Sequence, residues 1–474
     1  MKGKTAKISL LLIILLAAVS LRLKGLTFQS LWLDELINLH NSSPAVSLGQ
    51  TIRFCREVEH TPPLFYILIW VWQRILGAGE FSARLLPALF GVLGVGGIYC
   101  LGRELFSEKT GLIASAVTAL LPFHIMYSQE VRPYSLLFLT VVLSYLFLVR
   151  LLSRPVWKNA LCYWLFTVLL LYTHYFGLFV FAAQLFFIAV FLGAAGTNRN
   201  ALLKKMLPAL LLIALACLPW LPTLLRMVQI DAFWIKPPAP RFFIGFFRQY
   251  IGSEPYLFAV FVFLLIGYLL SGENREGFAE SRLLLASWIF ITLFIPYFRS
   301  FNHPPILIVR YSTAVLPVII LMAARGLTLL PDAKFRYFLL GTVILLLLVN
   351  LFYTRGGYYR TVTKPQWREA AEYIILNDPE GEYPVCAQPS FNYYFDIIFG
   401  RPREVVWEIT NLSEARTWHR RTAEEMIPAF WLLEVKPIAF DPEIWDFFDR
   451  RFQRVQSVEL RGAKAVLYSA DRPE

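Results

Sequence analysis

The chain has 474 residues, of which 57% are hydrophobic and only 16% are charged. Soluble globular domains carry about 25% charged residues, so the composition excludes an ordinary soluble domain and indicates a protein that crosses a membrane several times. The formal net charge is +12, but no basic stripe with stacking aromatics lies on a soluble region. We therefore expect Lys and Arg to face membrane lipids and expect no nucleic-acid partner.

The N-terminus combines a basic flank with an apolar core. Lys2, Lys4 and Lys7 precede the apolar segment Ile8–Leu26. This pattern resembles a signal peptide, but no clean small-residue cleavage site precedes Arg22. We predict an uncleaved first spanning helix whose N-terminus is cytoplasmic.

Further apolar segments approach the ~20 residues that a spanning helix needs. Eleven spans are expected in all: Ile8–Leu26, Ser82–Leu101, Gly111–Tyr127, Ser135–Leu152, Asn159–Thr173, Phe176–Ala195, Met206–Leu225, Leu257–Leu270, Leu283–Phe298, Tyr311–Ala324 and Tyr337–Tyr353.

The apolar segment Leu64–Leu76 is too short to count among the spans and contains Gln73 and Arg74. Leaving it out places the basic loops around Lys158 and Lys205 on the cytoplasmic side, as the positive-inside rule requires. We therefore predict an interfacial helix in the first external loop.

The chain after Tyr353 is charged and mixed in character. Helical and strand-like segments alternate from "PQWREAAEYIILND" through "EYPVCAQP", "AFWLLEVKPIAF" and "PEIWDFFDRRF" to "KAVLYSA". This alternation predicts a small α/β domain. The expected fold is a polytopic α-helical membrane domain over residues 1–355 and an extracytoplasmic α/β domain over 356–474.

Two acidic motifs lie in the first external loop. On spacing alone, Asp34 and Glu35 in "SLWLDEL" would be solvated or would cap a helix. Trp32 and Leu33 hold the pair at the interface, which argues against this simple reading. Glu59 and His60 in "EHTPP" precede the short apolar helix. They serve either as helix-dipole partners or as part of a cation or phosphate site.

Other polar residues fall on the same predicted face. Glu130, Arg132 and Tyr134 occur in "SQEVRPY" and would form either an anchoring ion pair or a functional group. His174 lies where two helices turn, and Arg310–Tyr311 begin another helix. For these the ordinary alternatives are a packed histidine and an arginine that snorkels to the interface.

Carboxylates, arginines and histidines over a lipid-accessible groove suit a lipid-phosphate-linked sugar donor. Its phosphate is an anionic leaving group that arginines or a metal would stabilise. The acceptor hydroxyl needs a general base, and no Gly-rich nucleotide loop is required.

The motifs "SLWLDEL", "EHTPPLFYILIWVW", "SQEVRPYSLL", "RYSTAVLPVIILMAARGL" and "WREAAEYI" resemble those of the GT-C membrane glycosyltransferases. The closest resemblance is to bacterial members of the protein O-mannosyltransferase superfamily (family 39 type), relatives of the lipid A aminoarabinose transferases. It implies an inverting, mannosyltransferase-like enzyme of the bacterial inner membrane. The donor would be a polyprenyl-phosphate sugar, and the acceptor a lipid, glycan or protein.

The resemblance also implies roles for individual residues. Asp34 would be the general base, Glu35 its supporting carboxylate and Glu130 an acidic residue of the second loop. Glu59 would contact a divalent metal, although His60 stands where relatives often carry Lys, and the metal requirement stays open. The substrate-binding candidates are His60, Arg132, Tyr134, His174, Arg310 and Tyr311.

Two rival functions remain. A lipid-linked sugar transporter or flippase would show inverted repeats and polar breaks near mid-membrane, and we find neither in the sequence. A non-catalytic membrane scaffold would tolerate loss of Asp34 but not of the tail. The enzyme hypothesis predicts that Asp34, Glu130, Arg132 and Arg310 converge on one external cavity.

Overall fold

The computed structural model describes residues 2–194, 199–229, 235–239, 241–252, 254–271, 278–406, 409–436 and 440–470. The chain forms two compact units. The first comprises Met1–Lys24, Gly49–Leu68 and Arg84–Arg360, and the second comprises Gly25–Leu48, Ile69–Ala83 and Thr361–Glu474. The second unit is therefore built from the tail together with two pieces of the first predicted external loop.

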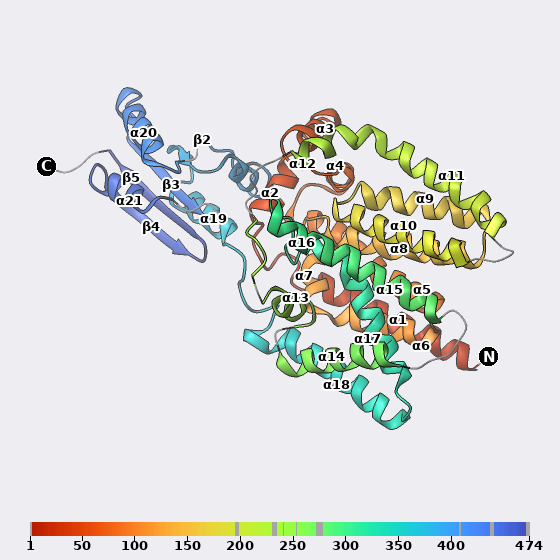
Figure 1. Cartoon of the computed structure of the whole chain (residues 1–474). Helices are drawn as coiled ribbons and strands as arrows, with labels where there is room; N and C mark the ends of the chain where they lie inside the picture. The colour runs from red at the N-terminus through yellow and green to blue at the C-terminus, as the bar shows by residue number, and fades with distance from the viewer. Residues whose placement is uncertain are drawn as a thin grey trace. The chain divides into compact units, whose positions relative to one another are not determined.

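The first unit is a bundle of helices (Figure 1). Its helices are α1 (Lys2–Leu23), α3 (Leu48–Glu57), α5 (Glu80–Leu105), α6 (Glu108–Leu120), α7 (Pro122–Ser128), α8 (Tyr134–Ser153), α9 (Trp157–Leu171), α10 (Phe176–Ala194), α11 (Arg199–Cys217), α12 (Leu221–Val228), α13 (Phe242–Ile251), α14 (Pro255–Leu270), α15 (Phe278–Ile289), α16 (Ile295–Asn302), α17 (Leu316–Leu329) and α18 (Ala333–Phe352). The short helix α4 (Leu64–Leu76) contributes residues to both units and has the bounds predicted from the sequence.

Eight helices in the described part of the chain are long and apolar enough to cross a membrane, or up to ten if each bent pair is one span. The remaining expected span, Asn159–Thr173, corresponds to α9, which has only 15 residues and falls short of this length. The protein is thus a polytopic helical membrane protein, as predicted.

One predicted span is broken. The segment Gly111–Tyr127 was expected as one helix, but α6 and α7 meet at a bend of 64°. Pro122 begins α7, and Leu121 before it is extended, with φ −71° and ψ 115°. A residue before proline avoids the helical conformation, and proline cannot donate the backbone hydrogen bond that would continue the helix.

Polar side chains inside the bundle bond to one another. Ser144 of α8 lies 2.9 Å from the Thr167 hydroxyl of α9, and the Gln184 amide of α10 donates to Ser144 at 2.9 Å. The Tyr163 hydroxyl also donates to Gln184. Hydrogen bonds between spanning helices satisfy groups that lipid cannot, and so fix α8, α9 and α10 side by side.

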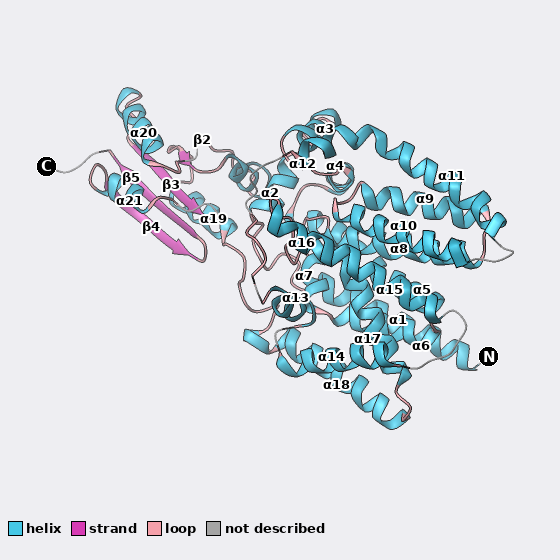
Figure 2. Cartoon of the chain, viewed as in Figure 1, coloured by secondary structure: helices cyan, strands magenta, loops and turns pink. Residues whose placement is uncertain are grey.

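The second unit holds a five-stranded sheet in the order β2-β1-β3-β5-β4 (Figure 2). The strands are β1 (Val385–Cys386), β2 (Val405–Val406), β3 (Ala429–Val435), β4 (Gln453–Leu460) and β5 (Ala463–Ser469). Strand β1 pairs in parallel with β2 and β3, whereas β5 pairs antiparallel with β3 and β4. The predicted α/β character of the tail is confirmed.

The helices of the second unit are α2 (Leu33–His40), α19 (Trp367–Asn377), α20 (Leu412–Glu424) and α21 (Pro442–Asp449). Aromatic side chains dominate one core of this unit. Phe430 of β3 packs within 5.1 Å of Phe452 and 5.6 Å of Phe448, measured between ring centroids. This core stabilises the sheet to which the remaining elements of the unit attach.

Candidate functional site

The predicted acidic pair begins helix α2 in the second unit, where the helix dipole favours negative charge. The two carboxylates have different environments. Glu35 is fully buried, and its carboxylate accepts a hydrogen bond from the Lys364 ammonium at 2.9 Å. Asp34 is partly exposed. Glu35 is therefore held by a cation of the tail, and Asp34 is the member of the pair that solvent reaches.

Several hydrogen bonds fix the loop before α2 to the tail. The Gln29 side chain accepts from the backbone N–H groups of Thr363 and Lys364 and donates to the Thr361 carbonyl. The Ser30 hydroxyl donates to Glu369 at 2.5 Å. These bonds place the acidic motif and the first residues of the tail in one structural element.

A second group of ion pairs lies beside this loop. Arg368 at the start of α19 donates to Glu80 at 2.7 Å and to Glu369 at 2.9 Å. The pKa of Arg368 is raised although burial alone would lower it, because Glu80 and Glu369 stabilise its charge. Sequence reasoning missed Lys364, Arg368 and Glu80 because their partners are far away in the chain.

In the first unit, the loop between α7 and α8 carries Glu130 and Arg132. The Arg132 N–H donates to the Glu130 carbonyl at 2.7 Å, which closes a tight turn. Gln129 anchors the turn by donating to the carbonyls of Arg22 and Lys24, each at 2.8 Å. The loop geometry is thus fixed by contacts with the end of α1.

Aromatic rings join this loop to two other predicted site segments. The rings of Tyr134 and His174 lie 6.2 Å apart, those of His174 and Tyr311 5.0 Å, and those of Tyr134 and Tyr311 6.4 Å, between centroids. Arg132 lies 5.9 Å from the Tyr134 ring, and Arg310 lies 5.7 Å from the Tyr311 ring. Residues from three loops therefore form one cluster.

His174 is a neutral hydrogen-bond donor in this cluster. Burial and the positive charges of Arg132 and Arg310 lower the pKa of His174 to about 3. The Phe176 N–H donates to His174 Nδ1 at 3.1 Å, so Nδ1 is unprotonated. The ring proton is therefore on Nε2, and the cluster offers two guanidinium groups and one neutral N–H to an anion.

Glu59 and His60 lie in the turn between α3 and α4, in the first unit. His60 adopts φ 47°, and its Nδ1 lies 2.9 Å from the Arg56 carbonyl, to which it donates. The turn follows a small hydrophobic cluster in which Cys55 packs with Trp220, and Tyr172 and Tyr175 lie beside them. These contacts fix the turn against the loop that carries His174.

The structure thus gathers Glu130, Arg132, Tyr134, His174, Arg310 and Tyr311 within the first unit and holds Asp34 and Glu35 in the second. The convergence of Asp34 with Glu130, Arg132 and Arg310 stays a prediction.

Among the described residues, no three His, Cys, Asp or Glu side chains are grouped as a metal ion would require. Glu59 as a metal ligand stays a prediction.

Comparison with known proteins identifies the fold. The family model for dolichyl-phosphate-mannose-protein mannosyltransferase matches residues 60–224. No curated protein sequence matches the chain significantly.

Among solved structures, ArnT from Cupriavidus metallidurans in the apo state is 12% identical and superposes with a TM-score of 0.63, covering 99% of this chain and 98% of that one. The same protein bound to undecaprenyl phosphate gives 12% identity, the same coverage and a TM-score of 0.60. The Archaeoglobus fulgidus oligosaccharyltransferase in complex with Zn and sulfate is 15% identical with a TM-score of 0.55, covering 89% of this chain and 67% of that one. The chain therefore has the GT-C fold of these membrane proteins, as the sequence motifs predicted.

Proposed function

We propose that this membrane protein is an inverting glycosyltransferase that moves a sugar from a polyprenyl phosphate to a hydroxyl acceptor. The main support is the cluster of Arg132, Arg310 and neutral His174. These groups provide charge-assisted and neutral hydrogen bonds suited to a phosphate. The matching ArnT structure bound to undecaprenyl phosphate supports a polyprenyl-phosphate ligand for this chain.

In the proposed reaction, the acceptor oxygen attacks the anomeric carbon as Asp34 removes the hydroxyl proton. The bond between the anomeric carbon and the phosphate oxygen breaks, and polyprenyl phosphate leaves with the electron pair. Arg132 and Arg310 stabilise the charge that develops on the phosphate, and His174 Nε2–H donates to one of its oxygens. Attack opposite the leaving group inverts the anomeric configuration.

The different environments of the acidic pair support separate roles for Asp34 and Glu35. Glu35 is buried against Lys364 and positions α2, whereas Asp34 is partly exposed and accessible to an acceptor. Glu130 is nearly buried beside the phosphate-binding candidates and is the alternative base. The basic flank of α1 supports a cytoplasmic N-terminus, which would put this chemistry on the outer face of the membrane.

Two experiments separate binding from chemistry. Binding of undecaprenyl phosphate to purified protein should weaken in Arg132→Ala and Arg310→Ala, but not in Arg226→Ala. Arg226 is exposed on α12 of the same unit and serves as the control. Equal binding in all four proteins would contradict the phosphate site.

The second experiment follows sugar transfer from an undecaprenyl-phosphate hexose, with mannose tested first because the matched family model describes mannosyltransferases. Release of undecaprenyl phosphate together with a glycosylated product would support a transferase. Movement of the intact sugar lipid across a vesicle membrane, without bond cleavage, would support the transporter instead.

A further inference from the structure

We propose that the protein has a second lipid site, in which a basic pocket at the ends of α5, α8 and α9 binds the phosphate of an anionic phospholipid. The pocket has a volume of about 450 Å³. Four cationic side chains line it: Arg103 from α5, Arg150 from α8, Arg154 just after α8, and Lys158 from α9. It lies outside the cluster of Arg132, His174 and Arg310.

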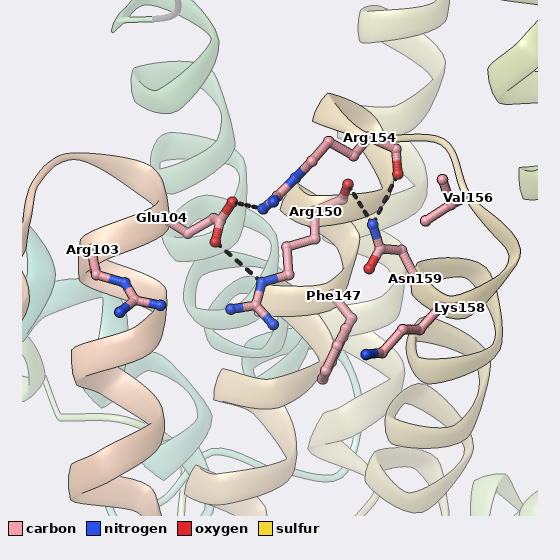
Figure 3. A pocket seen from close by; sticks show the side chains of 8 residues that line it. All are labelled: Arg103, Glu104, Phe147, Arg150, Arg154, Val156, Lys158 and Asn159. Atoms are coloured by element: carbon pink, nitrogen blue, oxygen red, sulfur yellow. Dashed lines mark hydrogen bonds and ion pairs between the residues drawn. The ribbon is translucent and has the colours of Figure 1, made fainter.

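The charges in the pocket are unbalanced. Glu104 is the one carboxylate among the described residues of the lining; it accepts from Arg150 at 3.1 Å and also pairs with Arg154. Glu108 lies outside the lining, where its charge interacts with that of Arg103 and pairs with Lys7. The lining keeps an excess of positive charge, which a bound anion would offset. Figure 3 shows the charged ends of Arg103, Arg150 and Lys158 directed toward the same space.

Hydrogen bonds fix the backbone beside the pocket. The Asn159 side chain donates to the carbonyls of Arg150 and Arg154, at 3.1 Å and 2.8 Å, and so satisfies the end of α8 (Figure 3). Helix α9 begins at Trp157, and its N-terminus adds partial positive charge beside Lys158. The helix ends that carry Arg150, Arg154 and Lys158 are therefore joined without a ligand.

The position of the pocket indicates which leaflet supplies the ligand. Helix α8 begins at Tyr134 in the aromatic cluster and ends at Ser153 beside the pocket. Twenty helical residues extend about 30 Å, which is the thickness of the hydrocarbon core. The basic pocket thus meets the leaflet opposite the one next to the proposed phosphate site.

Apolar groups favour a lipid over a free phosphate ion. Phe147 and Val156 belong to the lining. Val156 and the adjacent Trp157 are 51% and 49% exposed, and tryptophan is enriched at membrane–water interfaces. A phosphate ion would use only the charges, whereas a phospholipid would also cover these apolar surfaces with its glycerol and acyl groups.

Native mass spectrometry of the full chain tests the assignment. Wild-type protein should retain phosphatidylglycerol in preference to phosphatidylcholine with the same acyl chains. The Arg103→Gln/Lys158→Gln variant should lower phosphatidylglycerol occupancy at least about tenfold, because each basic residue near the surface contributes to binding of anionic lipid. It leaves the ion pairs of Glu104 with Arg150 and Arg154 in place, which protects the fold.

The control is Lys109→Gln, which removes an exposed charge near the start of α6 that does not line the pocket. It should bind phosphatidylglycerol like wild type, and phosphatidylglycerol should raise the Tm of both proteins but not that of the double variant. Equal phosphatidylglycerol binding in the double variant and wild type would overturn the site. Displacement of the lipid by millimolar inorganic phosphate would overturn the lipid assignment. Neither readout depends on sugar transfer, so failure of the proposed enzyme activity would be recognised separately.

Discussion

The ion pair between Lys364 and Glu35 should be essential for the stability of the second unit. Glu35 is fully buried, the Lys364 side chain is 14% exposed, and the charged atoms are 2.9 Å apart. In Lys364→Met the aliphatic chain stays, but the carboxylate loses the Lys364 ammonium. Removing one partner of a buried pair costs about 3–5 kcal/mol, and the lower end applies because water reaches Lys364.

A buried thiol provides the assay. Cys386 of β1 is fully buried in the second unit, so an alkylating reagent modifies it only when that unit opens. A loss of about 3 kcal/mol should increase its labelling rate about 150-fold, as measured by peptide-resolved mass spectrometry. The mass spectrum distinguishes the peptide that contains Cys386 from the peptides that contain the other four cysteines.

Two variants make this test specific. Glu35→Gln/Lys364→Met removes both charges and should label more slowly than Lys364→Met alone, since no uncompensated buried charge remains. Lys436→Met removes an exposed lysine just after β3 and should label like wild type. If Lys364→Met labelled Cys386 within about threefold of wild type, the pair would not stabilise this unit, and the reasoning from burial would be refuted.

Three further predictions follow from the site and the packing. Asp34→Asn should lower sugar transfer by ~10²–10⁴-fold, with undecaprenyl phosphate binding unchanged, and a loss below about tenfold would exclude it as the base. The pKa of His174, about 3 when folded, is below its ordinary value of 6.5. The unfolded chain therefore binds the extra proton, and stability should fall as pH drops from 6.5 toward 3, by up to ~1.4 kcal/mol per pH unit. Tm measured against pH should show a shallower acid loss in His174→Gln, and parallel curves would contradict this. A Cβ on Gly326 of α17 would lie 2.0 Å from the Leu264 carbonyl oxygen of α14, so Gly326→Ala should cost about 1–3 kcal/mol and lower Tm. Gly341→Ala in α18 meets nothing within 4 Å and is the matched control, so equal Tm values would refute the packing argument.

The sequence predicts the spanning helices well because their apolar length is a local property. It also predicts α4 with its correct bounds, since Leu64–Leu76 is one apolar segment. The bend between α6 and α7 was missed although Pro122 signalled it, because an apolar stretch continues on both sides. Strand β4 was also missed, because it lacks an apolar pattern. Its residues are mostly exposed, so it lacks the apolar alternation by which strands are recognised.

The sequence identifies the candidate residues of the site but not the contacts that hold them. Arg22 lies near the outer end of the first predicted span, where the positive-inside rule does not favour a basic residue. In the structure it is fully buried and donates to the Thr118 and Ala119 carbonyls, at the end of α6. The Glu35–Lys364 pair joins residues 329 positions apart, and no local pattern signals such a contact.

The same long-range pairing has a consequence for biosynthesis. Gln29 bonds to a backbone N–H 334 residues further along the chain. At about 5–20 residues per second, that partner is synthesised tens of seconds after Gln29 leaves the ribosome. During this interval Glu35 lacks its lysine, and the segment Gly25–Leu48 lacks the tail against which it folds. The N-terminal helices can therefore insert before the acidic motif is ordered, and a nascent chain that ends before Thr361 would leave this motif unfolded even if every spanning helix were in place.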